Sequence, residues 1–563
     1  MLNKIFRHLR NKSLISTILF RASRLTKSFY FDFPKYKNIL FTNKTFIGKK
    51  IKDNKSSIES YCMIYQENRS SYTSNQFDIP KLEILKGVKS KFYKTTIDKP
   101  SLIPIGLLHE NTILDVESSN QKLSLNYLGR LDYKNKFLYL SFNEPSDLKI
   151  TSNKNLIFGH KLEKLQILKT KKKLVLQIFI DGLSQLVFDN TNLDELMPNT
   201  NKFFDGGINH NNCFSNGEWT LPSSASIMTG CYTGKHGLFH TTKDHQINSK
   251  KKLMSEYFQE NGYITFLVTP NWRQSPLYGY TRGFDRIIYR RDGLKVNDVI
   301  YQFKEQINAF PDRSTYAFLS IFDLHDVYYK KLPEISLQVK SNLDSYSNKN
   351  AKNKESVFSN YDLNLVEEYK NKIKYIDRYL EDLYTFINNH YDNNEVIINL
   401  VSDHGQSFLG GSGHILSPER THVKFMLKDS SLNTSNCRNI MQNVDVLPTI
   451  LDLAGIDYKR DEIDGKNIFD TNSDNRYLAF SQSVFPGQTY KACIRDSENE
   501  FYFESEKNLG ENLVIDFKKA KYSKFNRMEG QEISMRNDEI EFIQEFIIKE
   551  INKSEYLTYI FQG

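Results

Sequence analysis

The stretch KKKLVLQIFIDGLSQ, residues 171–185, decides the fold class of this chain. A charged lead runs into a continuous apolar stretch that ends at Asp181 and Gly182, which is typical of a buried parallel strand ending in a loop. Two other segments show the same pattern of an apolar run followed by an acidic residue: EVIINLVSDHGQS, residues 395–407, and STYAFLSIFDLHD, residues 314–326. Ligands in open α/β sheets gather at the carboxyl ends of strands, so we expect the polar residues at these three places to converge.

Helical patterns between these runs predict an α/β fold, with a sheet sandwiched by helices. Residues 365–391 repeat apolar residues at spacings of three and four and predict a helix, whereas the polar stretch 341–360 predicts a surface loop. Residues 127–142, YLGRLDYKNKFLYLSF, predict a β-hairpin around the YKNK turn. Beyond residue 480 the pattern indicates short strands, followed by a closing helix from about Asp538 to Asn552.

A length of 563 residues predicts two or three domains. Their expected boundaries are a basic amphipathic segment at 1–29, a β-rich accessory domain at 30–168, a catalytic core at 169–480, and strands with a helix at 481–563 that complete the catalytic domain as a small α+β subdomain.

Composition indicates a soluble globular protein, with 39% hydrophobic and 25% charged residues. The net charge of +9 favours anionic partners, but the Lys residues are scattered and do not form the Arg-rich clusters of nucleic-acid binders. Residues 1–27 place apolar side chains at helical spacing among basic ones, which predicts peripheral contact with an anionic membrane. We find no spanning helix and no signal peptide, so we expect a cytoplasmic protein, in contact with the inner membrane surface at most.

Chemically active side chains follow the three strand ends. Asp181 follows the first, Asp323 with His325 the second, and Asp403 with His404 the third, while His414 comes ten residues after His404. Carboxylate oxygens and imidazole nitrogens are the ligands that divalent ions such as Zn²⁺, Mn²⁺, Mg²⁺ or Ca²⁺ take in proteins. The predicted metal ligands are Asp181, Thr220, Asp403 and His404.

Thr220 lies in WTLPSSASIMTG, residues 219–230, which crowds hydroxyl side chains around one proline. The plain interpretation is a helix start, where hydroxyls cap free amides. The functional interpretation adds a bound cation that lowers the pKa of the Thr220 hydroxyl and makes it a nucleophile. A helix N-terminus also stabilises a bound anion, so Ser223 and Ser224 would line a substrate pocket, together with Asn271.

These segments resemble the sulfatase branch of the alkaline phosphatase superfamily, in order, over roughly residues 170–510. TLPSSASIMTGCYTGKHG is similar to the nucleophile segment, VSDHGQS to the metal-binding strand end, and residues 443–469 to the segment that follows. The resemblance implies an alkaline-phosphatase-like mixed sheet and a metal-dependent enzyme. Formylglycine sulfatases have Cys or Ser at the nucleophile and usually Arg four residues later, where this chain has Thr220 and Ser224, so sulfate ester hydrolysis is disfavoured.

DLHDVYYKKLPE and SDHGQSFLGGSGHILSPERTHVKFML resemble motifs of phosphoethanolamine transferases, which are related to the lipoteichoic acid synthases. The resemblance implies that Thr220 carries the transferred group as phosphothreonine, and that His325 and His414 bind the phosphoryl group or the leaving group. The transferases have Glu where Asp181 stands, and a block of membrane helices that is absent here. Related phosphodiesterases bind two ions, so Asp323, His325 and His414 could hold a second; we expect one tight metal ion.

Three functions compete at this point. The first is transfer of phosphoglycerol or phosphoethanolamine from a phospholipid or nucleotide-activated donor to a sugar of a bacterial surface glycan. The second is a phosphodiesterase, phosphatase or sulfatase-like hydrolase that uses water as the acceptor. The third is a catalytically silent glycan-binding module. This alternative is disfavoured because the chain keeps the complete set of Asp181, Thr220, Asp403 and His404.

Overall fold

The computed structural model describes residues 50–51, 59–65, 81–119, 121–127, 136–163, 172–189, 191–240, 246–311, 313–328, 361–411, 414–432, 437–470 and 478–560. The predicted N-terminal segment 1–29 and the predicted loop 341–360 lie outside these residues. Among the helices of the described ranges, none combines the length and the apolar content that a membrane span requires.

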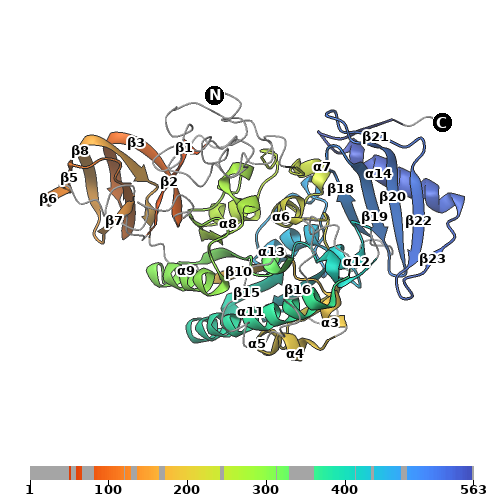
Figure 1. Cartoon of the computed structure of the whole chain (residues 1–563). Coiled ribbons are helices and arrows are strands. Elements are labelled where there is room, and N and C mark those ends of the chain that lie inside the picture. The colour runs from red at the N-terminus through yellow and green to blue at the C-terminus, as the bar shows by residue number, and fades with distance from the viewer. Residues whose placement is uncertain are drawn as a thin grey trace, which may run out of the picture. The chain divides into compact units, whose positions relative to one another are not determined.

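A mixed sheet forms the core of residues 172–470 (Figure 1). Its middle strand, β10 (Leu174–Ile180), pairs in parallel with β14 (Thr315–Ile321) and β15 (Val396–Val401). On one side, β12 (Ile264–Thr269) and β13 (Arg286–Tyr289) continue the parallel order. On the other side, β16 (His422–Lys428) runs antiparallel to both β15 and β11 (Ile208–Phe214). The expected mixed α/β fold is confirmed.

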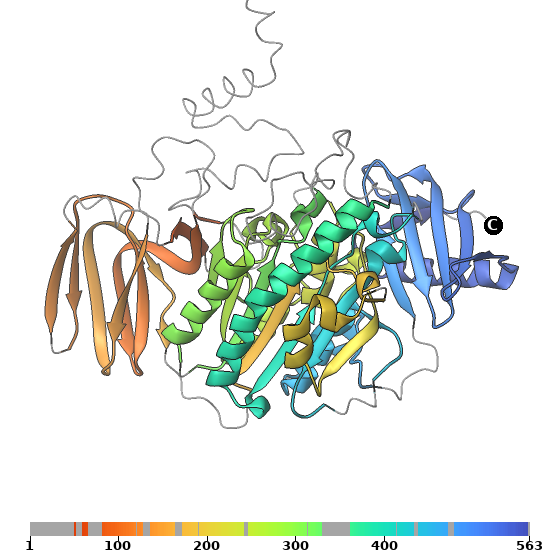
Figure 2. The same ribbon diagram turned by 60° about the horizontal axis from the view of Figure 1, so that its bottom comes forward.

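Helices cover both faces of this sheet. On one face, α9 (Val296–Ala309) and α11 (Leu363–His390) lie side by side (Figure 2), and α5 (Pro198–Phe203) packs against α11. Every side chain of β10 is buried, and its alternate residues Leu174, Leu176, Ile178 and Ile180 join the cluster with these helices. On the opposite face, Tyr316 of β14 contacts Met228 of α6 (Thr220–Thr229) and stacks on Phe258 of α8 (Met254–Glu260). Burial on both faces explains the continuous apolar strands.

The N-terminal strands extend the central sheet. β3 (Leu82–Ile97) pairs antiparallel with β13, and β8 (Ser146–Gly159) pairs along most of β3. The predicted hairpin at 127–142 is not formed by the described strands: β6 (Lys122–Tyr127) pairs with β5 (Thr112–Glu117), whereas β7 (Phe137–Phe142) pairs with β4 (Ser101–Gly106). β6 therefore forms a hairpin with the strand before it, and β7 pairs with a strand about 35 residues earlier in the sequence.

The C-terminal region forms a separate antiparallel sheet. It orders β18 (Ala479–Ser483), β19 (Thr489–Arg495), β20 (Asn499–Asn508), β22 (Lys521–Asn526) and β23 (Glu532–Ile533). Helix α14 (Asn537–Asn552) buries Ile543, Ile547 and Ile551 in the cluster with this sheet. The remaining short elements that bear on the site are η3 (Trp272–Gln274), η5 (His325–Tyr328), α12 (Pro418–Thr421) and α13 (Val446–Leu453).

Candidate active site

The parallel register of β10 and β15 brings Asp181 and Asp403 to the same edge of the sheet. Gly182, the residue after Asp181, has a φ of 80°, and a Cβ there would lie 2.5 Å from Gln406 Nε2. Glycine is therefore required at this turn. The Gly182 amide donates a hydrogen bond to Asp403 Oδ1 at 3.0 Å, which fixes the second carboxylate against the first strand end.

Thr220 is the first residue of α6 and is 1% exposed. The chain reaches it through a tight turn at Gly217, where a Cβ would lie 2.8 Å from Pro222 Cγ. The Ser223 hydroxyl donates to the Gly217 carbonyl at 3.1 Å and fastens the turn. Trp219, the residue before the helix, makes no capping hydrogen bond with its side chain, so the hydroxyl-rich segment begins a helix without a hydroxyl cap.

Asp181, Asp403 and His404 form a buried group, called here the metal cluster, in which one ligand atom of each lies within 4.8 Å of the others. Thr220 Oγ1 donates to Asp181 Oδ2 at 3.1 Å and lies 3.2 Å from His404 Nε2. His404 Nδ1 lies 2.8 Å from the Gly405 carbonyl, so Nδ1 carries the proton of the neutral ring and Nε2 presents its lone pair to the cluster.

The metal cluster has the chemistry of a cation site. Asp181 Oδ1 and Asp403 Oδ2 are buried and have no hydrogen-bond partner among the described residues, and they lie 3.6 and 3.5 Å from His404 Nε2. Burial, together with the charge of Asp403, raises the pKa of Asp181 to about 7, and burial raises the pKa of Asp403 to about 6. Burial lowers the pKa of His404 to about 4, which keeps the imidazole neutral. These residues fit a divalent cation, which would balance both carboxylates.

The residues predicted to bind substrate make positioning contacts in the structure. Asn271 Nδ2 donates to Asp181 Oδ2 at 2.7 Å, while its Oδ1 accepts from the Arg273 amide at 3.1 Å. Ser224 Oγ accepts a hydrogen bond from Gln274 Nε2 at 3.0 Å. Asn271 therefore orients a metal-cluster carboxylate, and the hydroxyls of Ser223 and Ser224 hold the start of α6 in place.

The structure does not gather the three residues suggested for a second ion. The His325 ring stacks on Phe322 with centroids 4.4 Å apart, whereas the His414 ring packs edge-on against Tyr502 with centroids 4.3 Å apart. Within the described ranges, Asp323, His325 and His414 form no ligand group like the metal cluster. The physical reason is that Asp323 and His325 follow β14, whereas the C-terminal sheet holds His414.

The sequence patterns did not identify two arginines that lie beside the site. The Arg273 guanidinium lies 4.4 Å from the Trp272 ring centroid and 5.8 Å from that of Trp219. Its charge opposes the rise that burial causes in the pKa of Asp181 and adds to the fall that burial causes in the pKa of His404. Its Nε and Nη1 are buried without a hydrogen-bond partner among the described residues. Arg273 lies two residues after Asn271, in the segment that follows β12, and this position after a buried strand could have indicated a site residue.

Arg420, in α12, is 2% exposed and donates through Nη2 to the carbonyl of Glu218, two residues before Thr220. Its Nε has no hydrogen-bond partner in the described part of the chain. Burial lowers the pKa of Arg420 to about 10, so it stays charged at neutral pH. Together the two guanidinium groups and the first turn of α6 give the site a strong preference for an anion.

Comparison with known proteins identifies the family of this chain and agrees with its fold. The model of the family described as Sulfatase matches residues 173–456, slightly more than half of the chain. A candidate sulfatase from Bacteroides thetaiotaomicron VPI-5482 shares the fold with a TM-score of 0.50 at 13% identity, over 69% of this chain and 93% of that one. A phosphonate monoester hydrolase from Silicibacter pomeroyi has the same TM-score and identity, over 69% of this chain and 96% of that one. The chain belongs to the sulfatase family, within the alkaline phosphatase superfamily, and is an enzyme of sulfatase-like type.

Proposed function

We propose that the chain transfers a substituted phosphoryl group, phosphoglycerol or phosphoethanolamine, through a covalent intermediate on Thr220. The observation that carries the proposal is the Thr220 hydroxyl, buried at the start of α6 between Asp181 and His404, at 3.1 and 3.2 Å. A hydroxyl nucleophile needs an adjacent proton acceptor or a cation, and this geometry offers both.

The side chain of Thr220 favours phosphate over sulfate chemistry. Formylglycine is an aldehyde made at the Cβ of Cys or Ser, but the Cβ of Thr carries a methyl group, so its oxidation would yield a ketone. Ser224, four residues later, accepts a hydrogen bond from Gln274 and carries no charge, unlike the Arg of formylglycine sulfatases. Thr220 is therefore proposed to react as an alcohol.

In the proposed reaction, Thr220 Oγ1 attacks the phosphorus of a phosphodiester donor. The new bond is Oγ1–P, the broken bond joins phosphorus to the leaving-group oxygen, and the leaving group departs as an alcohol after taking the proton that Asp181 received from Thr220. The Thr220 proton goes to Asp181 Oδ2, which already accepts its hydrogen bond. An acceptor hydroxyl then attacks the same phosphorus and gives its proton to Asp181, which returns it to Thr220 Oγ1 as the Oγ1–P bond breaks.

The anionic oxygens of the donor are proposed to lie against Arg273, Arg420 and the first turn of α6. The unsatisfied nitrogens of Arg273 and Arg420 supply charged donors that are worth more in this buried setting than in water. A divalent cation held by Asp181, Asp403, His404 and Thr220 would supply further charge stabilisation and lower the pKa of the nucleophile. Asn271 keeps Asp181 in place for both roles.

The acceptor separates this proposal from a second candidate. In the first, the acceptor is a sugar hydroxyl of a bacterial surface glycan, and the donor is a phospholipid or a nucleotide-activated alcohol. In the second, water is the acceptor and the enzyme is a phosphodiesterase or a sulfatase-like hydrolase. The match to the Sulfatase family favours the hydrolase, whereas Thr220 favours a phosphoryl intermediate.

Intact-mass measurement tests the proposal. The protein is incubated with phosphatidylglycerol, phosphatidylethanolamine and nucleotide-activated glycerol, and the adduct is located by peptide mapping. We expect a mass increase of one substituted phosphoryl group on Thr220, absent from Thr220→Ala and kept in Ser226→Ala, which loses a different buried hydroxyl of the same helix. Release of the adduct by sugars but not by water indicates the transferase, and release by water alone indicates the hydrolase. A protein that turns over its donor without any adduct on Thr220 contradicts both.

A further inference from the structure

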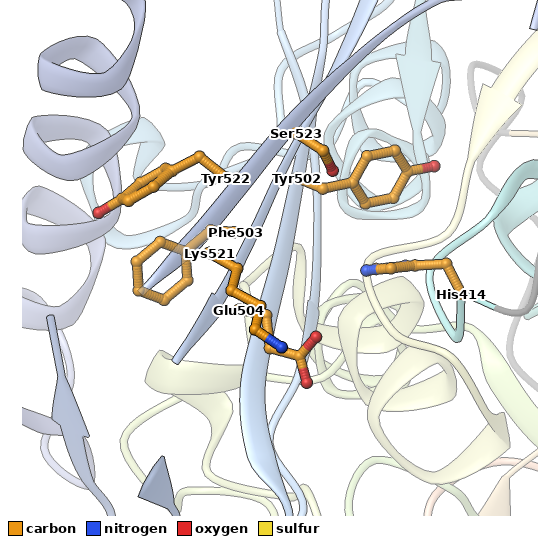
Figure 3. A pocket seen from close by; sticks show the side chains of 7 residues that line it. All are labelled: His414, Tyr502, Phe503, Glu504, Lys521, Tyr522 and Ser523. Atoms are coloured by element: carbon orange, nitrogen blue, oxygen red, sulfur yellow. The ribbon is translucent and has the colours of Figure 1, made fainter. Parts of the chain in front are cut away.

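A cavity of about 420 Å³ lies where the C-terminal sheet meets the segment after the metal-binding strand end. It is lined by His414, Tyr502, Phe503, Glu504, Lys521, Tyr522 and Ser523 (Figure 3). We propose that this cavity binds a sugar unit of the acceptor. The inference deepens the proposed function and rests on it, because it gives the second half of the transfer a binding site that the metal cluster does not provide.

Strand register sorts the lining residues onto two faces. Tyr502 pairs with Ser523 and Glu504 pairs with Lys521 across β20 and β22, whereas Phe503 pairs with Tyr522 between them. Side chains alternate across a sheet, so the first four share one face. Figure 3 shows His414 on that side of the strands, while Phe503 and Tyr522 point the other way, into the cluster with α14.

The polar groups on this face suit a ligand that is rich in hydroxyls. Glu504 Oε1 accepts from Thr489 Oγ1 at 2.6 Å and pairs with Lys491 Nζ at 3.1 Å, while Oε2 makes no hydrogen bond with the described residues. Ser523 offers a hydroxyl, and the exposed Lys521 ammonium makes no ion pair in the described part of the chain. The pairs Tyr502–Ser523 and Glu504–Lys521 thus place a carboxylate, a hydroxyl and an ammonium close together. These groups can accept hydrogen bonds from, and donate them to, neighbouring hydroxyls of one sugar ring.

An aromatic wall and an imidazole complete the cavity. The Tyr502 hydroxyl donates to Glu500 at 2.6 Å, which fixes its ring against His414. His414 Nδ1 accepts from the Leu416 amide at 3.1 Å, so the proton of the neutral ring lies on Nε2. Burial lowers the pKa of His414 to about 4, and the ring stays neutral in the physiological range. An uncharged donor beside a ring is suited to a polyol and does not select for a phosphate.

The cavity is rigidly tied to the reaction centre. Arg495 is fully buried, pairs with Glu500 at 2.7 Å, and donates to the Leu416 carbonyl at 2.5 Å and to Thr421 Oγ1 at 2.9 Å. These bonds hold the C-terminal sheet against the segment that runs from His414 to α12. Arg420 lies in the same short helix and contacts the residue two positions before the nucleophile. A sugar in the cavity is thus held by the segment that also supplies an arginine of the anion site.

The same charges argue against a phosphate or a peptide as the occupant. The Glu504 carboxylate repels a phosphate, and Lys491 is already paired with Glu504, so among the described lining residues Lys521 alone remains to face a single anionic group. A peptide would need apolar side chains that face the cavity. Phe503 and Tyr522 instead pack on the other face of the sheet, against α14. A saccharide, neutral or carrying one carboxylate opposite Lys521, matches the groups that remain.

Two surface substitutions test the cavity with little risk to folding. Lys521→Ala and Ser523→Ala remove an exposed and a half-buried side chain, and Lys519→Ala removes a matched exposed lysine just outside β22. We expect the double variant Lys521→Ala/Ser523→Ala to raise the acceptor KM about tenfold, equivalent to about 1.4 kcal/mol, without changing the rate of adduct formation on Thr220. Lys519→Ala should change neither quantity. An unchanged acceptor KM in the double variant would overturn the proposal.

A binding measurement separates this inference from the proposed function, because it needs no turnover. Saturation-transfer difference NMR with glucose and with glucuronate is recorded on the full chain and on both variants. We expect sugar signals that the double variant loses and Lys519→Ala keeps. A loss for glucuronate alone shows that the cavity binds an acidic sugar, and a loss for both shows that the carboxylate is not required. Equal signals in all proteins, or none in any, contradict the cavity assignment even where Thr220 forms its adduct. Missing adducts with intact, variant-sensitive sugar binding contradict only the transfer reaction.

Discussion

Replacement of Thr220 by alanine should separate catalysis from stability. The Thr220 hydroxyl is buried and has two partners, Asp181 Oδ2 at 3.1 Å and His404 Nε2 at 3.2 Å. Its loss leaves Asp181 Oδ2 bonded to Asn271 at 2.7 Å, so only the contact to His404 is left without a replacement. One unsatisfied buried group costs about 1–3 kcal/mol, so we expect the free energy of unfolding to fall by about 1–2 kcal/mol.

The expected loss of rate is much larger than this loss of stability. Removing a covalent nucleophile lowers kcat by on the order of 10⁴–10⁶-fold, which corresponds to a barrier increase of roughly 5–8 kcal/mol. Hydrolysis of bis(4-nitrophenyl) phosphate measures the rate, and urea unfolding measures the stability. Thr220→Ser, which keeps a hydroxyl at the same helix position, should retain measurable turnover and form the adduct.

Ser226→Ala is the matched control for this pair of measurements. It removes another fully buried hydroxyl of α6, which lies 3.3 Å from His236 Nε2, and should cost similar stability without the loss of rate. Turnover by Thr220→Ala above about a hundredth of the parent rate would refute the nucleophile role, because alanine has no hydroxyl with which to form the covalent intermediate. Equal rate losses in Thr220→Ala and Ser226→Ala would assign the effect to helix packing instead.

Three further predictions follow from the metal cluster and the N-terminus. Asp403→Asn or His404→Ala should lose both bound metal and activity, measured by metal analysis of the purified protein, while full occupancy would show that the ion lies elsewhere. The pKa of Asp181 is raised to about 7 and that of Asp403 to about 6, from 3.8, so the metal-free fold binds protons that the unfolded chain releases and loses stability as pH rises from about 4 to 7. Added Mn²⁺ or Zn²⁺ should therefore raise Tm more at about pH 8 than at about pH 6, and an equal rise would argue against binding by these carboxylates. Deletion of residues 1–27 should release the protein from anionic liposomes in a sedimentation assay, since each surface Lys or Arg contributes about 1 kcal/mol; unchanged binding would place the membrane contact outside this segment.

The local sequence predicts the strand ends that hold the candidate site, because parallel strands have a simple geometry. A buried strand that ends in Asp-Gly places Asp181 at the carboxyl edge, and the strand at 396–401 places Asp403 and His404 at the same edge. The crowded hydroxyls before an apolar pair likewise indicate a helix start at Thr220. These predictions depend only on periodicity, turn chemistry and the rule that ligands gather where parallel strands end.

Contacts between distant segments could not be predicted in this way. Whether Asn271 faces a substrate or the Asp181 carboxylate depends on how β12 and β10 are placed on either side of β14. The sequence shows His414 only as a histidine in a glycine-rich loop; the C-terminal sheet, through Tyr502, decides that it lines a separate cavity and does not join a second metal site. Periodicity reports which face of an element is buried, but the partner that buries it comes from packing across the whole chain, and that packing determined the surroundings of the candidate catalytic residues.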